Sequence, residues 1–385
     1  MNYKAQQLVK VAVTYDFSET VIETLKAKDY KNVFLAVDKF LLESNTIKKL
    51  LEQFDQNNIK YYVYDEIVPN PPVELVNEGA DIFKSNNCDS ILAIGGGSVI
   101  DAARGINIVR KHGGSISDYV FDKEVPSFCE SLIAVPTTSG TGSEVSNAVV
   151  VTDTEKNEKL TVLSDNALSE FTILAPELVV TLPPEQTKAT GLDAFTHAME
   201  AYTSVLSTPV IDAICEKIMF LIVKYLPQAV ENGEDLEARE RMMVAALLGG
   251  WVINNSGTQV GHSQAHVLGV KYNIPHGAAC AYAAPGTLEL TAKEEPKKIR
   301  EIGNILNTDI PHNASNEDVG RIVSEKFKQF RDDIIQLQSF SEYDISEEEL
   351  LKNAKDVSIE RFAENSPVKV TEDVAEELLR KFGKQ

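Results

Sequence analysis

The chain contains few of the residues that would build a disulfide-bonded or zinc-ribbon protein. Its 385 residues include only four cysteines, and these show no CxxC pair and no repeated spacing: Cys88, Cys129, Cys215 and Cys280. A chain of this size can fold without disulfides, and cysteines scattered in this way do not indicate a redox pair. We therefore expect reduced thiols and a cytoplasmic protein.

Basic residues and long apolar runs are also scarce. The chain has 37 Lys and Arg against 58 Asp and Glu, a net charge of −21. Without a basic surplus to neutralise phosphate groups, nucleic acid is not an expected partner, nor is an anionic membrane surface. No apolar run reaches the roughly 18 residues of a membrane span, and MNYKAQQLVKVAVTYDF is too polar for a signal peptide. A small-molecule ligand in a local pocket remains compatible with this charge.

The first part of the chain alternates short apolar strands with amphipathic helices. Three helices are expected, at Leu41–Asp55, Val73–Asn87 and Val99–Lys111. The expected strands are Val33–Asp38, Lys60–Val68, Ser90–Ser98 and Ser131–Thr138. This alternation predicts a doubly wound parallel sheet, with ligands at the carboxyl ends of its strands.

After Val179 the pattern becomes helical. The stretch LPPEQTKATG marks a boundary, so we expect an α/β domain over residues 1–182 and an all-helical domain over residues 183–385. Helical periodicity covers Leu192–Ser204, Pro209–Leu226, Leu236–Val252, Pro296–Leu306, Glu317–Gln338 and Glu347–Ala363. The predicted architecture is therefore a parallel α/β sheet followed by a helical domain.

Two glycine- and hydroxyl-rich loops follow expected strands. GGGSVIDAAR begins with Gly95, Gly96, Gly97 and Ser98 and opens a helix, whose free N–H groups suit a nucleotide phosphate. It does not match GxGxxG, and glycine turns are common after strands. The second loop, PTTSGTGSEVS, offers hydroxyl groups at the same sheet edge: Thr137, Thr138, Thr141 and Ser143. Together the loops favour a nucleotide site over two unrelated surface turns.

Asp38 ends the first expected strand. A carboxylate there can accept hydrogen bonds from both ribose hydroxyls of an adenosine, and it repels a 2′-phosphate, which would favour NAD over NADP. Asp is also a common helix N-cap, and the sequence alone leaves these two roles open.

Four of the six histidines lie between residues 197 and 276, together with one carboxylate. Asp193 and His197 are four apart on an expected helix, His262 and His266 are also four apart, and we expect His276 in a Pro-His-Gly loop. Each has a simpler explanation by itself, such as a carboxylate complementing a helix dipole or a histidine in a core. Jointly, Asp193 with three imidazoles suits a borderline ion such as Fe²⁺ or Zn²⁺.

Four blocks of the sequence resemble the signature blocks of the iron-dependent (group III) alcohol dehydrogenases. They are GGGSVIDAAR, PTTSGTGSE, GLDAFTHAMEAY and GHSQAHVLGVKYNIPHG, and the likeness extends from about Val33 to SPVKVTEDVAEELL. The resemblance implies that the N-terminal domain binds NAD and the helical domain binds the metal. It also implies at least a dimer.

The resemblance assigns roles to particular residues. Metal ligands would be Asp193, His197, His262 and His276, with Fe²⁺ expected and Zn²⁺ possible. His266 is similar to a non-ligand histidine that relays a proton near the nicotinamide. The implied cofactor-binding residues are Asp38, Asn70, Gly96, Gly97, Ser98, Thr137, Thr138, Thr141 and Lys159, next to Gly95.

These features predict an NAD-dependent, metal-dependent enzyme that interconverts a small primary alcohol and its aldehyde. A lyase of the dehydroquinate synthase type is one alternative, but it needs several basic residues for a phosphorylated, carboxylated sugar, and only Lys188 and Lys271 lie near the motifs. A non-catalytic protein that binds metal or nucleotide is the other.

Overall fold

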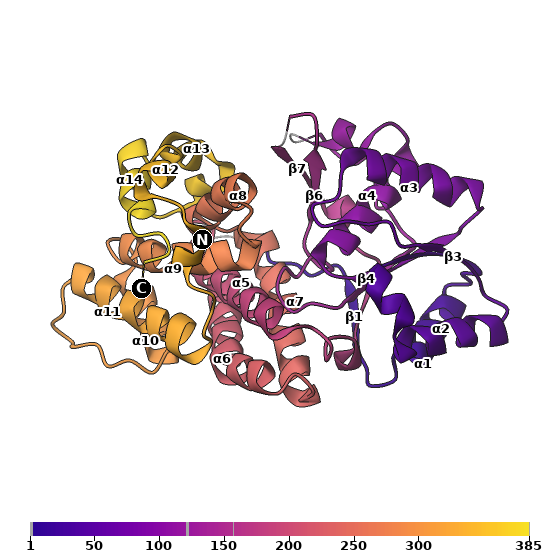
Figure 1. Cartoon of the computed structure of the whole chain (residues 1–385), viewed down its shortest axis with the longest axis horizontal. Helices are drawn as coiled ribbons and strands as arrows, with labels where there is room; N and C mark the ends of the chain where they lie inside the picture. Colours follow the sequence, from indigo (N-terminus) through magenta and orange to yellow (C-terminus); the bar gives the residue numbers. More distant parts are fainter. Residues whose placement is uncertain (1–2, 121–122, 157, 385) are drawn as a thin grey trace. The chain divides into compact units, whose positions relative to one another are not determined.

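The computed structural model describes residues 3–120, 123–156 and 158–384, which divide into two compact units. The α/β unit comprises residues 7–138 and 142–181. The helical unit comprises residues 182–384 together with residues 3–6 and 139–141. Figure 1 shows the elements of both units along the chain.

The α/β unit is built on a six-stranded sheet in which every pairing is parallel. Its strand order is β1-β8-β5-β4-β2-β3. The strands are β1 (Lys10–Val13), β2 (Asn32–Val37), β3 (Lys60–Tyr64), β4 (Ser90–Gly95), β5 (Leu132–Pro136) and β8 (Phe171–Leu174). The predicted parallel sheet is confirmed, whereas the short strands β1 and β8 were not predicted.

Helices cover both faces of this sheet, as Figure 1 shows. Side chains of successive strand residues point to opposite faces, so Phe34 of β2 packs with the core of α3 and α4, whereas Val33 packs with that of α1 and α2. The helices are α1 (Phe17–Ala27), α2 (Asn45–Gln56), α3 (Val73–Ser85) and α4 (Gly97–His112), with short η1 (Lys39–Glu43) and η2 (Ile116–Tyr119). The sheet is therefore doubly wound.

A two-stranded antiparallel hairpin accompanies the sheet. Strands β6 (Ala148–Asp153) and β7 (Glu158–Leu163) form it, and the short helices η3 (Asp165–Ala167) and η4 (Pro176–Leu178) follow. The Thr152 N–H of β6 donates to the Pro71 carbonyl at 2.8 Å, which fixes the hairpin beside the segment after β3. The sequence patterns had not indicated this hairpin.

The helical unit surrounds the buried helix α5, which packs against α6, α7 and α9. Its longer helices are α5 (Pro184–Thr203), α6 (Pro209–Glu231), α7 (Leu236–Ser256), α8 (Val260–Tyr272), α9 (His276–Thr291), α10 (Pro296–Ile305), α11 (Asn316–Gln329) and α14 (Glu372–Leu379). The shorter ones are η5 (Phe330–Ile334), η6 (Phe340–Tyr343), α12 (Glu347–Leu351), α13 (Ala354–Ile359) and η7 (Arg361–Asn365). Within the described residues, no helix is both long and apolar enough to cross a membrane.

Three expectations about the helical unit were wrong. His276 does not lie in a loop but is the first residue of α9, after the N-cap Pro275. The expected single helix Glu347–Ala363 is divided into α12, α13 and η7, and the helix expected over Glu317–Gln338 ends as α11 and continues into the π-helical η5. In both segments the polar and apolar residues recur with a nearly helical period across the short elements. Periodicity alone therefore does not show where one helix ends and the next begins.

Candidate metal centre and nucleotide-binding loops

Helix α5 carries the first two candidate metal ligands. Asp193 and His197 are four positions apart, so they project from one face, as predicted. That face is buried: the two side chains are 3% and 5% exposed. The helix can sit this deep because Gly191 faces Leu226 of α6, where a β-carbon would be too close to the leucine methyl groups.

The remaining candidate ligands come from the first turns of α8 and α9. His262 is the third residue of α8, and His276 begins α9. Between the two helices, Asn273 caps α8 in a left-handed conformation (φ 53°). Gly277 lets α9 start directly against α5, because a β-carbon there would collide with the Ala189 carbonyl. The close contact between these helices brings His262 and His276 to Asp193.

Three imidazole nitrogens surround one oxygen of Asp193. Its Oδ1 lies 3.8 Å from His197 Nε2, 3.8 Å from His262 Nε2 and 3.7 Å from His276 Nε2. Asp193 Oδ1 and His262 Nε2 are buried, and neither has a hydrogen-bond partner in the described part of the chain. Buried polar atoms without partners are costly, so this arrangement fits a cation that these atoms would share.

The protonation of His197 suits such a cation. Burial lowers the pKa of His197 below its ordinary value, despite the opposing effect of Asp193. A metal binds the neutral imidazole, so the low pKa keeps the ligand in its binding form.

Glu200 is a functional candidate that the sequence patterns did not single out. It is fully buried on α5, and one oxygen accepts a hydrogen bond from His262 Nδ1 at 2.9 Å. The other accepts from the backbone N–H groups of Gln259 at 2.6 Å and His262 at 3.2 Å. A β-carbon at Gly261 would collide with this carboxylate. Glu200 therefore holds a proton on His262 Nδ1, which would leave Nε2 as the nitrogen that binds a metal ion. The sequence signal for a role of Glu200 was its position three residues after His197, which places the two side chains on the same helix face.

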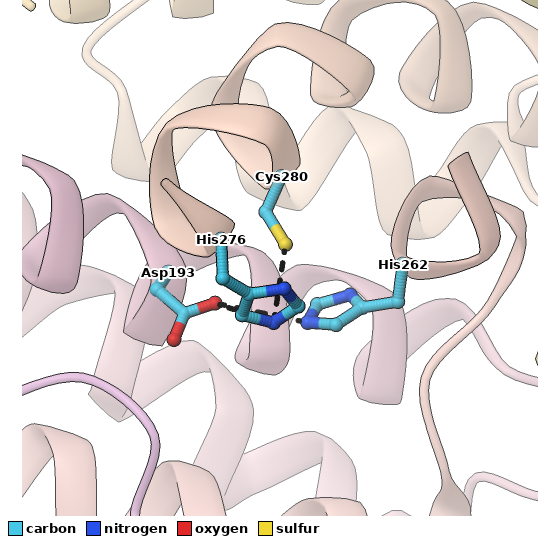
Figure 2. Close-up of side chains that lie close together, drawn as sticks. All are labelled: Asp193, His262, His276 and Cys280. Carbon is cyan, nitrogen blue, oxygen red and sulfur yellow. Dashed lines mark hydrogen bonds and ion pairs between the residues drawn. The ribbon is translucent and has the colours of Figure 1, made fainter. Parts of the chain in front are cut away.

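Cys280 is the second such residue. Figure 2 shows it together with Asp193, His262 and His276. One atom from each of these four side chains lies within 4.8 Å of the other three. Cys280 was not predicted as a candidate ligand because the four cysteines share no spacing pattern, although it follows His276 by one helical turn.

His266 lies next to the candidate ligands and has its own carboxylate partner. Its ring stacks on that of His276, with centroids 5.4 Å apart, and its Nδ1 is 3.1 Å from Glu360 Oε1. Glu360 also accepts a hydrogen bond from Ser263 Oγ at 2.6 Å. The hydrogen bond at Nδ1 therefore fixes the orientation of the His266 ring. The His266 side chain is 29% exposed.

In the α/β unit, the first glycine loop closes tightly on Asp38. Asp38 is the N-cap residue of η1 but makes no side-chain capping bond; instead its Oδ2 accepts a hydrogen bond from the Gly96 N–H at 3.3 Å. A β-carbon at Gly95 would lie 2.5 Å from Val99 and 2.8 Å from that oxygen. Helix α4 then starts at Gly97. The loop thus brings a carboxylate and the N-terminus of a 16-residue helix together at the carboxyl edge of the sheet.

The other candidate cofactor residues are placed differently. Asn70, left-handed at φ 54°, donates its N–H to Ser98 Oγ at 3.4 Å, so these two lie together. The Thr137 N–H bonds to the Gly95 carbonyl, and a β-carbon at Gly96 would lie 3.3 Å from Thr138. The other two candidates are not part of this loop: Lys159 lies on β7, paired with Thr152, whose N–H bonds to the Pro71 carbonyl next to Asn70, and Thr141 is grouped with the helical unit.

Comparison with known proteins identifies the family. The family model "Iron-containing alcohol dehydrogenase" matches residues 11–176, and "Fe-containing alcohol dehydrogenase family, C-terminal" matches residues 187–383. The chain belongs to the iron-containing alcohol dehydrogenase family. Members are metal-dependent oxidoreductases that act on alcohols, so the resemblance seen in the four sequence blocks is confirmed.

Several individual proteins are similar to this chain. "Alcohol dehydrogenase 4" of Schizosaccharomyces pombe is 36% identical over 73% of this chain and 66% of its own length. "NAD-dependent methanol dehydrogenase" of Bacillus methanolicus is 35% identical over 74% of this chain and 75% of its own length. A solved structure of a 1,3-propanediol oxidoreductase superposes with a TM-score of 0.91 at 30% identity, covering 99% of this chain and all of that one.

Proposed function

We propose that the protein transfers a hydride between NAD(H) and a small primary alcohol or aldehyde, with a divalent metal ion as cofactor. The observation that carries this proposal is the meeting of three imidazole Nε2 atoms at 3.7 to 3.8 Å from Asp193 Oδ1, where Asp193 Oδ1 and His262 Nε2 are buried and have no hydrogen-bond partner among the described residues.

Asp193, His197, His262 and His276 would hold the ion, Fe²⁺ or Zn²⁺. Imidazole and carboxylate ligands suit both metals, and the supply of metal in the cell would decide between them. When bound, the ion supplies Lewis acidity that stabilises negative charge on the substrate oxygen. Asp193 and Glu200 contribute buried negative charge that favours a dication at this position.

The glycine loop of the α/β unit would hold the cofactor. The N–H groups at the start of α4 suit its pyrophosphate, and Asp38 suits the hydroxyls of the adenosine ribose, which favours NAD over NADP. Asn70 and Ser98 adjoin this loop, as do Thr137 and Thr138. Lys159 and Thr141 stay candidates on the resemblance alone.

His266 would relay the proton of the alcohol. Its Nδ1 faces Glu360, so the hydrogen bond keeps that nitrogen protonated and leaves Nε2 to exchange a proton with the substrate side or with water. Glu360 would therefore hold the His266 ring in the orientation that the relay needs.

The substrate class follows from the relatives, whose names include methanol and 1,3-propanediol dehydrogenases. A lyase acting on a phosphorylated sugar acid is less well supported, because Lys188 and Lys271 are both engaged. Lys188 bonds to Glu185 and to the Gln336 carbonyl, and Lys271 bonds to Asn353.

We also propose a cytoplasmic homodimer or larger homo-oligomer. The four cysteines are free thiols, which fits a reducing compartment. The edge strand β1 exposes Val11 and Val13, which a second copy of the chain would cover.

The test is the oxidation of NADH by the purified protein with a series of short aldehydes. Protein stripped of metal is compared with protein reloaded with Fe²⁺ or Zn²⁺, and NADPH replaces NADH in a parallel series. We expect turnover only with metal and a preference for NADH. Failure of every aldehyde, while NADH and metal both bind, would contradict the proposed reaction and favour the lyase or the binding protein.

A further inference from the structure

Cys280 points toward the same centre as the candidate metal ligands. It lies one turn beyond His276 on α9, where residues four apart share a face. Its Sγ is 3.7 Å from His276 Nε2, and Figure 2 shows the thiol directed at this group of side chains. The thiol is fully buried, so it faces the centre from the protein interior.

The spacing of these atoms suits ligands of one ion. Atoms that bind a single metal at about 2.0 to 2.3 Å stand roughly 3 to 4 Å apart. The separation of 3.7 Å between Cys280 Sγ and His276 Nε2 falls in this range, as do the separations of Asp193 Oδ1 from the imidazoles. The thiol is thus at ligand spacing from His276, and the ligand atoms of Cys280, Asp193, His262 and His276 all lie within 4.8 Å of one another.

A second observation indicates that this group receives a cation. Asp193 Oδ1 and His262 Nε2 belong to the same cluster as Cys280, and both are buried without a hydrogen-bond partner among the described residues. A thiol is a weak donor and a weak acceptor, so it does not satisfy them as a carboxylate or amide would.

The other three cysteines differ from Cys280 in one respect. Cys88, Cys129 and Cys215 are buried in hydrophobic clusters, as Cys280 is, but none of the three joins a group of metal-ligating side chains in the part of the chain that the structure describes. Cys215, on α6 of the same unit, provides a matched control.

Cys280 leaves room for a substrate. Asp193 and His262 are each 3% exposed and Cys280 is 0% exposed, whereas His276 is 31% exposed. The sulfur would thus bind from the buried side, and the accessible side next to His276 and His266 would stay open.

We propose that Cys280 is an additional ligand of the catalytic metal, binding through its sulfur beside Asp193 and the three histidines. This inference rests on the proposed function, because it concerns the same ion. As the metal–sulfur bond forms, the thiol proton is lost to solvent. Sulfur is a softer donor than nitrogen or oxygen, so Cys280 would shift the preference of the centre toward Zn²⁺ and Co²⁺ and away from Mg²⁺ or Mn²⁺.

The test is the absorption spectrum of the full-length protein reloaded with Co²⁺. Visible d–d bands report that cobalt is bound, and a near-ultraviolet thiolate-to-cobalt charge-transfer band reports that sulfur is a ligand. Wild type and Cys215→Ala should show both. Cys280→Ala should keep the d–d bands, lose the charge-transfer band and bind Co²⁺ about tenfold or more weakly.

Each other outcome overturns the inference. The d–d bands without a charge-transfer band in wild type would mean that Cys280 is not a ligand, while the metal site of the proposed function stands. A charge-transfer band that persists in Cys280→Ala would assign the sulfur to another cysteine. The absence of both bands in wild type would overturn the inference and the proposed metal site together. If a variant fails to fold, a wild-type spectrum without the charge-transfer band still overturns the inference, and the band in Cys215→Ala still excludes Cys215 as its source.

Discussion

The two units of the molecule build their candidate sites by different means. In the α/β unit, main-chain groups of a short contiguous loop, Gly95 to Ser98, face one carboxylate at the end of a neighbouring strand. In the helical unit, side chains between residues 193 and 276 come from three separate helices. A backbone site depends on local conformation, whereas a side-chain site depends on how helices pack.

The glycines of the two units illustrate this difference. Gly95 lets the loop close on Asp38, and Gly96 lets it approach Thr138, so both act at the candidate cofactor site itself. Gly261 and Gly277 contribute no group to a site. They leave space for Glu200 and for the start of α9, so they act through the packing that aligns the histidines. Substitutions in the two units should therefore have separable effects on cofactor and metal.

The largest effect is expected for Asp193→Ala. Removing the oxygen that faces all three imidazoles should abolish metal binding and reduce turnover by more than the roughly 10- to 100-fold cost of an outer-shell change. NADH binding should persist, because the glycine loop belongs to the other unit. Metal content by mass spectrometry and NADH fluorescence test this, with the exposed Asp309→Asn as control. Retained metal would contradict the assignment.

The counterpart in the α/β unit is Gly95→Ala. The added β-carbon would approach Val99 and Asp38, so the loop must shift. We expect NADH affinity to fall about tenfold, and overpacking to cost about 1 to 3 kcal/mol of stability. Gly96→Ala, with 3.3 Å to Thr138, should be milder. A loss of metal content with unchanged NADH affinity would argue against the separation of the two sites.

Glu200→Gln tests the support of His262. The amide cannot accept as many hydrogen bonds from Nδ1 and the backbone N–H groups, so we expect metal affinity to fall about 10- to 100-fold. Competition with a chromophoric chelator measures this, and the exposed Glu231→Gln is the control. Unchanged metal affinity in Glu200→Gln would mean that the Glu200 carboxylate contributes packing but does not support His262 as a ligand.

Glu360→Gln should affect the proton relay without affecting the metal. We expect kcat to fall about tenfold, with KM and metal content unchanged, because the orientation of His266 is weakened. Glu364→Gln, an exposed change in the same segment, should leave kcat at the wild-type value. A rise in KM alone would instead place Glu360 in substrate binding.

The last change affects stability and not activity, and it concerns Glu144, a buried acid of the α/β unit. Burial raises its pKa from 4.5 to about 7. The folded protein keeps this proton where the unfolded chain has lost it, so stability should fall as pH rises from about 4.5 to about 7, by up to about 3 kcal/mol. Denaturant unfolding at about pH 5 and about pH 8 measures this loss. Glu144→Gln should remove that part of the pH dependence, and an unchanged slope in the variant would assign it to another group.

The sequence predicted four of the six sheet strands, β2 to β5, and the α/β class because parallel strands are short apolar runs between clear breaks. It did not predict α8 and α9 as helices. Apart from residues near its start and end, α9 is buried on all sides, so it has no amphipathic rhythm to detect. Strands β1 and β8 have four residues each, too few for a pattern.

The candidate ligands could be named from spacing and family resemblance, since two pairs share the i,i+4 interval. Their supporting residues could not. Glu360 is separated from His266 by 94 positions, and nothing in the spacing relates them. Cys280 likewise became a candidate only when α9 placed it beside His276.

The most direct test of the central claim is a crystal of the protein grown with Zn²⁺ and measured at the zinc absorption edge. We expect one strong anomalous peak in the helical unit, about 2.0 to 2.3 Å from Asp193 Oδ1 and from the Nε2 atoms of His197, His262 and His276. A fully folded protein with no peak at this position, or with its zinc bound elsewhere, would contradict it.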